Sequence, residues 1–195
     1  MDRLRCQISL ATALVALIGV ALPAQGPMSG TTWGAELAAG VGPTTAWLLK
    51  FRSPDVAWTL GLAADLQNST STITGVAAAL PENSATSGAF FVSVGYRGYR
   101  QLGSALRPFT EFGAQTTYNA VYGDNISSVH IWSLGPYLAL GASYFFNPHV
   151  SLGASGTLGA AYARSTTSIG GGGRLRTSSF GVAANAVRLL GAVYF

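Results

Sequence analysis

Apolar and polar positions alternate along the chain from about Thr32 to the C-terminus. Between Val56 and Gln67, one set of alternate positions reads Val, Trp, Leu, Leu, Ala, Leu, and the other reads Ala, Thr, Gly, Ala, Asp, Gln. A strand places these two sets on opposite faces, whereas a helix would mix them. The same separation recurs over residues 132–146 and 150–162. The pattern therefore predicts a chain built from β-strands.

Eight strands are predicted in all. Most are long enough for a tilted membrane span, which takes about 9–11 residues. Short turns that contain proline, at 53–55 and 147–149, alternate with longer connections at 69–86, 121–128 and 164–176, although the connection at 42–43 is short. This rhythm is typical of an all-β, eight-stranded antiparallel up-and-down transmembrane β-barrel. The predicted strands are 32–42, 44–52, 56–68, 87–99, 107–120, 129–146, 150–163 and 177–195.

The second face of the predicted strands is small or polar, and it lacks the large apolar set that a soluble core needs. We therefore expect the apolar faces to meet lipid. Aromatic residues on these faces form two bands, as in the interfacial girdles of membrane barrels. The band near the short turns is Phe51, Trp58, Tyr96, Tyr144, Phe146 and Phe195, and the other band is Phe90, Tyr118, Trp132 and Tyr162.

Composition agrees with a lipid-facing chain. Of the 195 residues, 49% are apolar and only 9% are charged, against roughly 25% charged in average globular chains. The one long apolar run is Ile8 to Leu22, at the extreme N-terminus, and a spanning helix needs about 20 such residues. We therefore exclude a helical membrane protein.

The N-terminus has the pattern of a secretory signal peptide: a basic segment, an apolar run and a small-residue cleavage site. We expect residues 1–24 to be removed after export through the Sec pathway, leaving 25–195 as one barrel domain. Cys6 leaves with the signal, so the mature chain has no thiol chemistry. Its 9 basic and 6 acidic residues, after Asp2, Arg3 and Arg5 are taken from the totals of 11 and 7, are too balanced and scattered to predict nucleic-acid binding.

The C-terminal segment 185–195 alternates and closes on Phe195, and in this it resembles the last strand of Gram-negative outer-membrane barrels. Segments 99–113 and 144–148 are similar to periplasmic hairpins of small OmpA, OmpX and OmpW-like barrels. The resemblance covers essentially the whole mature chain. It implies residence in the outer membrane, contact with membrane lipid and lipopolysaccharide, and Phe195 as the signal that the barrel-assembly machinery reads.

Most of the charge falls on the positions predicted to face inward. Since the interior of an eight-stranded barrel is just wide enough for side chains to fill it, buried charges there must pair. We interpret the set as a salt-bridge plug, with Arg97 and Arg188 paired to Glu36 and Glu111; the alternative is a gated polar pathway. The predicted lumen network is Glu36, Lys50, Arg52, Asp65, Arg97, Glu111 and Arg188.

A catalytic site is not predicted. Nucleophilic catalysis of the Ser-His-acid kind needs an acid to orient the histidine, and no acid follows Asp124 in the chain. His149 and Ser151 have a suggestive spacing but fall in a short turn, and His130 lies near Ser127 and Ser128. The histidines and carboxylates do not cluster as metal ligands, so we expect no metal and no cofactor.

Two loop segments carry further hypotheses. The run Gly170–Gly173 lacks the strand–loop–helix context of a phosphate-binding loop, and we interpret it as flexible. Three arginines in this loop are candidates for contact with lipopolysaccharide phosphates, and the apolar stretch 73–80 is free to touch lipid, the barrel mouth or a partner. The arginines are Arg164, Arg174 and Arg176.

The sequence thus predicts a monomeric, non-enzymatic outer-membrane barrel with a structural, adhesive or other surface-interaction role and a plugged lumen. Two alternatives remain. One is a narrow channel or carrier for small hydrophobic molecules, which the resemblance to the OmpW-like group implies. The other is a lipid A-modifying enzyme.

Overall fold

The computed structural model describes residues 33–40, 44–71, 83–100, 105–123, 126–169 and 173–195. These residues form eight strands, and all eight predicted strands are confirmed. The expected signal peptide over 1–24, the connection at 42–43 and the apolar stretch 73–80 lie outside the described residues. The strands are β1 (Trp33–Ala39), β2 (Thr45–Ser53), β3 (Val56–Ser71), β4 (Asn83–Tyr99), β5 (Leu106–Gly123), β6 (Ile126–Asn147), β7 (Val150–Ile169) and β8 (Gly173–Tyr194).

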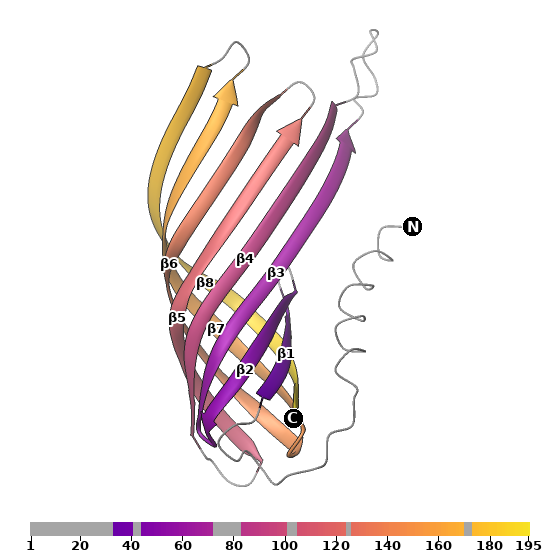
Figure 1. The fold of residues 1–195 in the computed structure, drawn as a ribbon, viewed down its shortest axis with the longest axis vertical. Coiled ribbons are helices and arrows are strands. Elements are labelled where there is room, and N and C mark those ends of the chain that lie inside the picture. The colour runs from indigo at the N-terminus through magenta and orange to yellow at the C-terminus, as the bar shows by residue number, and fades with distance from the viewer. Residues whose placement is uncertain (1–32, 41–43, 72–82, 101–104, 124–125, 170–172) are drawn as a thin grey trace.

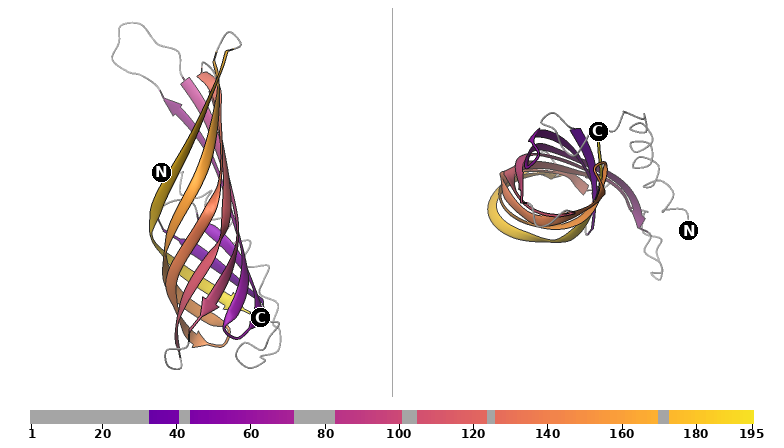
Figure 2. Two further views of the ribbon diagram at one scale, coloured as in Figure 1. Left: turned by 90° about the vertical axis from the view of Figure 1, so that its left-hand side faces the viewer. Right: turned by 90° about the horizontal axis from the view of Figure 1, so that it is seen from below.

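Each strand pairs antiparallel with its sequence neighbours, and β1 also pairs with β8, so the sheet closes into a barrel. The view from below in Figure 2 shows the closed ring. The two ends of the barrel domain complete the closure: the Trp33 N–H donates to the Phe195 carbonyl at 2.7 Å, and the Phe195 N–H donates to the Trp33 carbonyl at 2.8 Å. The predicted up-and-down meander is confirmed.

Two tight turns lie at the lower end of the barrel in Figure 1. Pro54 and Asp55 join β2 to β3, and Pro148 and His149 join β6 to β7. In the second turn the Asn147 Oδ1 accepts the His149 backbone N–H at 2.8 Å, the side-chain support that makes asparagine frequent in turns. We refer to this end as the short-turn end and to the opposite end as the loop end.

The strands differ greatly in length, and this shapes the barrel. β1 and β2 have 7 and 9 residues, whereas β3 to β8 have 16 to 22. As a result β2 pairs with β3 only as far as Leu62, and β1 pairs with β8 only from Leu189 onward. Figure 1 shows β1 and β2 confined to the short-turn half. Among the described residues, the loop-end halves of β3 and β8 therefore have a strand partner on one side only.

Large side chains fill the lumen of the short-turn half. This differs from the prediction of a small or polar inner face, and it corrects the position of Phe51, which is 1% exposed and points inward instead of joining the outer girdle. The buried cluster is Ala38, Leu49, Phe51, Ala57, Tyr99, Phe109, Leu190, Ala192 and Tyr194, with Trp47 and Phe145 packed against it.

Candidate functional site

An ion-pair network crosses the lumen in the short-turn half of the barrel, where all eight strands pair into a closed sheet; we call this part the closed half. Arg97 on β4 donates from Nη1 and Nη2 to the two carboxylate oxygens of Glu36 on β1, at 2.8 and 2.9 Å. Its Nε donates to Glu111 on β5 at 2.6 Å. All three side chains are buried, with 3%, 1% and 1% exposure for Arg97, Glu36 and Glu111. One guanidinium therefore ties three strands together, and its two-pronged contact with Glu36 is the strong form of such a bond.

The carboxylates of Glu36 and Glu111 share the guanidinium of Arg97. The one carboxylate oxygen that Arg97 does not reach, Glu111 Oε1, accepts hydrogen bonds from neutral hydroxyls. Thr59 on β3 and Tyr137 on β6 donate their hydroxyls to Glu111 Oε1, at 2.9 and 2.5 Å. Arg97 Nη1 also donates to the Tyr99 hydroxyl at 3.2 Å. Buried charges are tolerated when every polar atom has a partner, and these hydroxyls supply the partners that Arg97 alone does not.

The register of the sheet explains why these residues meet. Arg97 and Glu111 are directly opposed across β4 and β5, and both point inward. Gly95, the next inward position on β4, leaves room for the network: a Cβ there would lie 2.8 Å from Thr59 Oγ1 and 3.0 Å from Glu111 Oε1, and closer still to the Tyr137 hydroxyl.

Aromatic rings pack around and beside the network. The Arg97 guanidinium lies 4.3 Å from the ring centroid of Phe109, within reach of a cation–π interaction. The Phe51 ring lies 5.9 Å from that of Tyr99 and 5.7 Å from that of Tyr194, and Phe145 stacks on Tyr194 at 5.3 Å. The lumen of the closed half is thus occupied by an ion-pair network and an aromatic cluster together.

Of the seven charged residues predicted in the lumen, five point inward. Lys50 and Arg52 do not: both are exposed, because Leu49 and Phe51 take the inward positions of β2. The Lys50 ammonium lies over the ring of Trp33, 5.1 Å from its centroid. Both residues are close to the short turn at 54–55, where a long cationic side chain reaches polar surroundings from the outer face.

Arg188 and Asp65 point inward but take no part in the network. The predicted pairing of Arg188 with a glutamate is wrong, since Arg97 holds both Glu36 and Glu111. Asp65 instead accepts a hydrogen bond from Gln67 Nε2 at 2.8 Å. Both line a lumen cavity of about 320 Å³. Its walls also include Ala38, Thr45, Trp47, Ala63, Phe91, Gln115, Thr117, Asn119, Ser155, Thr157 and Leu190, with the network residues Glu36, Arg97, Glu111 and Tyr137.

Sequence reasoning missed the neutral members of the network. Thr59 and Tyr137 fall on faces that the alternation marks as inward, so their location was predictable, but their role as donors to Glu111 was not. Tyr99 and Phe109 follow the same logic, since each lies two positions from a network charge on the same face. An aromatic residue two positions from an inward charge is the sequence signal that indicates packing against the network.

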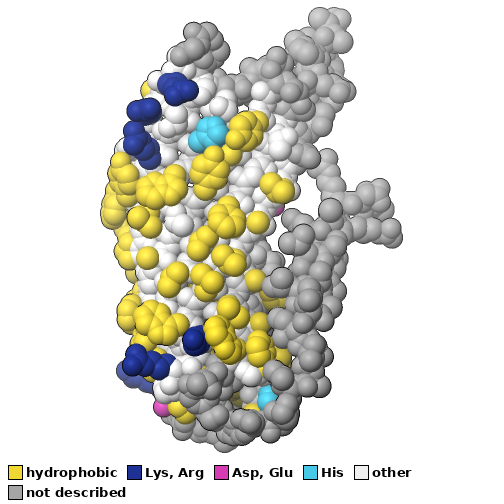
Figure 3. All heavy atoms as spheres, in the orientation of Figure 1, with side chains coloured by type: hydrophobic (Ala, Val, Ile, Leu, Met, Phe, Trp, Pro, Cys, Tyr) yellow, Lys and Arg dark blue, Asp and Glu magenta, His cyan; other side chains and the backbone are white. Residues whose placement is uncertain are grey.

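The exterior carries an apolar band bordered by aromatic residues. At the short-turn end, Trp58, Tyr96 and Phe112 form a row across three strands, with neighbouring ring centroids 5.4 and 5.5 Å apart. Figure 3 shows apolar side chains over the middle of the visible face and cationic groups toward both ends. No helix in the described part of the chain is long and apolar enough to cross a membrane. The exposed aromatic residues toward the loop end are Phe90, Tyr118, Tyr122, Trp132, Tyr162 and Phe180.

This chain folds as a small eight-stranded up-and-down β-barrel with an apolar outer band, the architecture of transmembrane β-barrels. No family model matches it, and no curated protein sequence matches it either. The solved structures similar to this chain include three whose low identities describe the fold alone. They are a major outer membrane protein from Thermus thermophilus (16% identity, 86% of this chain and 100% of that one, TM-score 0.49), Ail of Yersinia pestis (9%, 87% and 99%, 0.41) and CarO of Acinetobacter baumannii (13%, 86% and 98%, 0.39).

The structure brings the three arginines of the expected loop together on strands. β7 continues to Ile169 and β8 begins at Gly173, so the loop expected over 164–176 is largely paired sheet; residues 170–172 lie outside the described part. Arg164 faces Ser178, Arg176 faces Thr166 and Arg174 faces Ser168. All three arginines are exposed on the outer face, beyond the girdle residues Tyr162 and Phe180. Figure 3 shows cationic groups at this corner.

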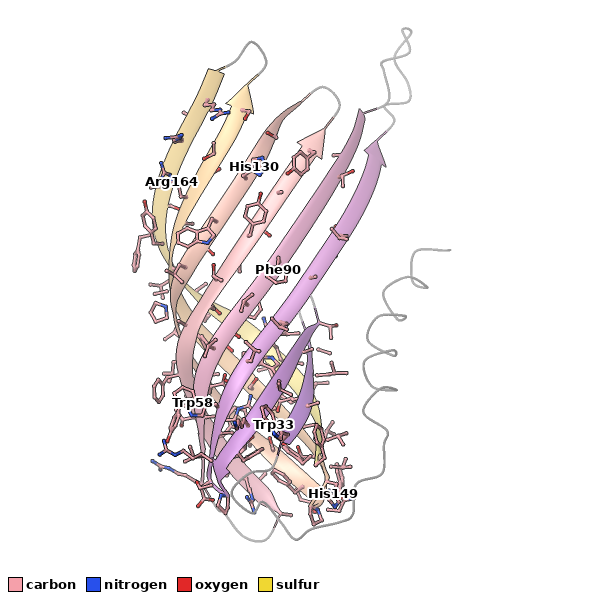
Figure 4. The ribbon with its side chains drawn as sticks, in the orientation of Figure 1. Trp33, Trp58, Phe90, His130, His149 and Arg164 are labelled. Atoms are coloured by element: carbon pink, nitrogen blue, oxygen red, sulfur yellow. The ribbon has the colours of Figure 1, made fainter. Side chains whose placement is uncertain are left out.

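The two histidines lie at opposite ends of the barrel (Figure 4). His149 Nδ1 lies 3.0 Å from the Tyr194 carbonyl, while the Ser151 hydroxyl pairs with the Tyr194 hydroxyl at 2.9 Å. His130 Nδ1 pairs with the Tyr118 hydroxyl at 2.7 Å; Asp124 and the Ser127 side chain lie outside the described part. Neither histidine forms a hydrogen bond with a serine among the described residues, which also contain no group of three or more His, Cys, Asp or Glu fit for a metal ion.

Proposed function

We propose that this protein is a non-enzymatic outer-membrane barrel with a structural or surface-interaction role, whose lumen is closed by its own side chains. The observation that carries the proposal is the buried Glu36–Arg97–Glu111 network, which joins β1, β4 and β5 across the lumen. A gated pathway needs polar groups that water and solutes can reach. Here the three charged side chains are almost fully buried, and their hydrogen bonds are made to one another and to the hydroxyls of Thr59, Tyr99 and Tyr137.

The aromatic cluster supports closure independently of the charges. Phe51, Tyr99 and Tyr194 pack ring against ring within the same half of the lumen. Neutralising one charge therefore removes only part of the seal. This argues for a barrel that is closed at rest rather than held shut by a single ion pair.

Single-channel recording in planar bilayers tests the closed lumen. Purified protein, first shown to be heat-modifiable in detergent gels, is expected to give no discrete conductance steps. The informative variant is Glu111→Gln, with Arg52→Gln on the outer face as its matched control. Discrete steps in the wild type that change with Glu111→Gln and not with Arg52→Gln would establish a channel through the network and overturn the proposal.

We further propose lipopolysaccharide as the partner at the loop end. Arg164, Arg174 and Arg176 lie on the outer face beyond the apolar band, which is the level at which anionic headgroups meet a barrel. Guanidinium groups bind phosphate in two-pronged geometry. The support is the convergence of three cations on two adjacent strands, with serine and threonine as their cross-strand neighbours.

Phe195 is proposed as the assembly signal. Its backbone closes the barrel against Trp33, so its ring can be changed without removing those bonds. Phe195→Ala is expected to lower the amount of protein inserted in cells while leaving folding into detergent micelles unchanged. A loss of the same size in both settings would assign the ring to stability rather than to assembly.

A further inference from the structure

The lumen cavity lies between the network and the loop end, and its volume of about 320 Å³ falls in the range of small-molecule sites. Glu36, Arg97 and Glu111 contribute to its lining and are committed to one another. The remaining wall combines apolar side chains with amides and hydroxyls. Such a mixture suits a ligand with one polar end.

Arg188 is the charged group in this wall that has no partner. Among the described residues it forms no hydrogen bond and no ion pair, and the nearby carboxylates are otherwise engaged: Glu36 and Glu111 by Arg97, and Asp65 by Gln67. A partly desolvated cation is costly unless an anion or water satisfies it. Gly40 at the end of β1 lets the Arg188 stem pass, because a Cβ there would lie 3.2 Å from Arg188 Cγ.

The cavity reaches two unpaired strand edges. Ala63, Ala64 and Asp65 line it from β3 and Arg188 lines it from β8. In the part of the chain that the structure describes, these positions begin the stretches where β3 and β8 have no partner strand on the facing side. The outward neighbours along these edges are apolar and exposed: Leu66 at 84%, Val187 at 67% and Leu189 at 64%. In lipid, an open sheet edge is tolerated where it lines a water-filled cavity or is covered.

From these observations we propose that the cavity binds a single-chain amphiphile with an anionic head. The head pairs with Arg188, and the apolar chain leaves the barrel between the open edges of β3 and β8 toward the surrounding lipid. Binding of this kind goes beyond the proposed function and does not require a passage through the closed half, because the network remains intact beneath the ligand.

Trp47 provides a reporter inside the site, since it lines the cavity while Trp33, Trp58 and Trp132 are exposed on the exterior. The chain has 4 tryptophans. Changing Trp33, Trp58 and Trp132 to Phe leaves Trp47 alone; a second variant that keeps Trp58 alone reports the bilayer. Both are placed in phosphatidylcholine nanodiscs and titrated with 2-bromohexadecanoate, whose bromine quenches tryptophan near the head.

We expect saturable quenching of Trp47 by the bromo acid and weaker quenching by 2-bromohexadecanol at the same mole fraction in the bilayer. Arg188→Gln is expected to weaken acid binding about tenfold or more, since a hydrogen bond to a charged group is lost, and to leave the alcohol unaffected. Arg188→Lys should retain most of the preference. Arg52→Gln is the control outside the site. Each variant is checked for heat-modifiability before titration.

Competition and chain length test the remaining parts of the proposal. Unbrominated hexadecanoate and hexadecyl phosphate should displace the bromo acid, and their relative strength tells a carboxylate head from a phosphate head. Hexadecyltrimethylammonium should not displace it. If the chain leaves between β3 and β8, 2-bromohexadecanoate binds at least as well as 2-bromooctanoate at equal mole fraction.

Three results would each overturn the site. The first is equal quenching by the acid and the alcohol, and the second is an unchanged response to the acid in Arg188→Gln. The third is quenching of Trp47 that does not differ from that of Trp58. Exclusion of the long acid while the short acid binds would overturn the exit between the strand edges. None of these results changes the expectation of zero conductance, so this proposal and the closed lumen fail separately.

Discussion

Arg97 and Glu36 face each other across the barrel lumen, 61 residues apart in sequence, and join through two hydrogen bonds of 2.8 and 2.9 Å. β4 and β1 are not neighbours in the sheet. The pair therefore links two non-adjacent strands, β1 and β4, through the lumen, and Glu111 on β5 extends the link to a third strand.

Removing the centre of this network should be costly. Arg97→Met leaves two carboxylates buried without their cation, and breaking a buried ion pair by removing one partner costs about 3–5 kcal/mol. The free energy of unfolding in lipid vesicles, measured by urea titration, is the readout. The triple variant Glu36→Gln, Arg97→Met, Glu111→Gln removes all charge together and is expected to recover most of the loss. A single variant as stable as the wild type would show that the network does not hold the barrel.

Gly95 is expected to be sensitive to substitution because it leaves the space that the network occupies. Gly95→Ala places a methyl group against Thr59, Glu111 and Tyr137, and overpacking of this kind costs about 1–3 kcal/mol. Gly98→Ala is the matched control on the same strand, because the nearest atom to its Cβ is the Thr110 carbonyl oxygen at 4.0 Å. The same urea titration compares the two. Equal effects at both positions would mean that the strand, and not the network, sets the cost.

The sequence predicts some features of the lumen network better than others. Alternation identifies the two faces of each strand, and it places Glu36, Arg97 and Glu111 together on the inner one. Alternation does not say which face is inside. On β2 the sequence predicts that the face with Lys50 and Arg52 points inward, yet Leu49 and Phe51 are the buried pair. Next to a short turn the outer face is close to water, and the cost of Lys50 and Arg52 there is small.

The loop ends show a second limit of pattern reading. The sequence predicts loops at segments 83–86, 121–123 and 164–169, and the first and last of these are rich in serine and threonine. They are strand in the structure. Beyond the apolar band both faces of a strand meet polar surroundings, so the alternation disappears while the backbone pairing continues. β1 and β2 are about half as long as the other strands, and this leaves the edges of β3 and β8 unpaired. Nothing in the alternation of apolar and polar residues predicts this difference in length.

The apolar band can be tested at its centre. On β6, Leu138 is exposed and lies between the girdle residues Trp132 and Tyr144. Leu138→Arg is expected to cost about 2–4 kcal/mol of folding free energy in lipid vesicles, as at a bilayer midplane, whereas Phe146→Arg beside the short-turn girdle should cost about 0–1 kcal/mol. If the two arginines cost the same, Leu138 does not lie at the membrane centre.

The arginine cluster at the loop end gives the last prediction. Replacing Arg164, Arg174 and Arg176 by Gln should remove the extra stability that lipopolysaccharide confers, about 3 kcal/mol if each cation near an anionic surface contributes about 1 kcal/mol. The measurement compares thermal unfolding in nanodiscs with and without lipopolysaccharide. Lys50→Gln with Arg52→Gln, at the short-turn end, is the matched control and should keep the difference. Because Arg164, Arg174 and Arg176 have no ion pair among the described residues, their loss should leave stability in phosphatidylcholine alone unchanged. An undiminished lipopolysaccharide effect in the triple variant would remove this surface as a lipid contact.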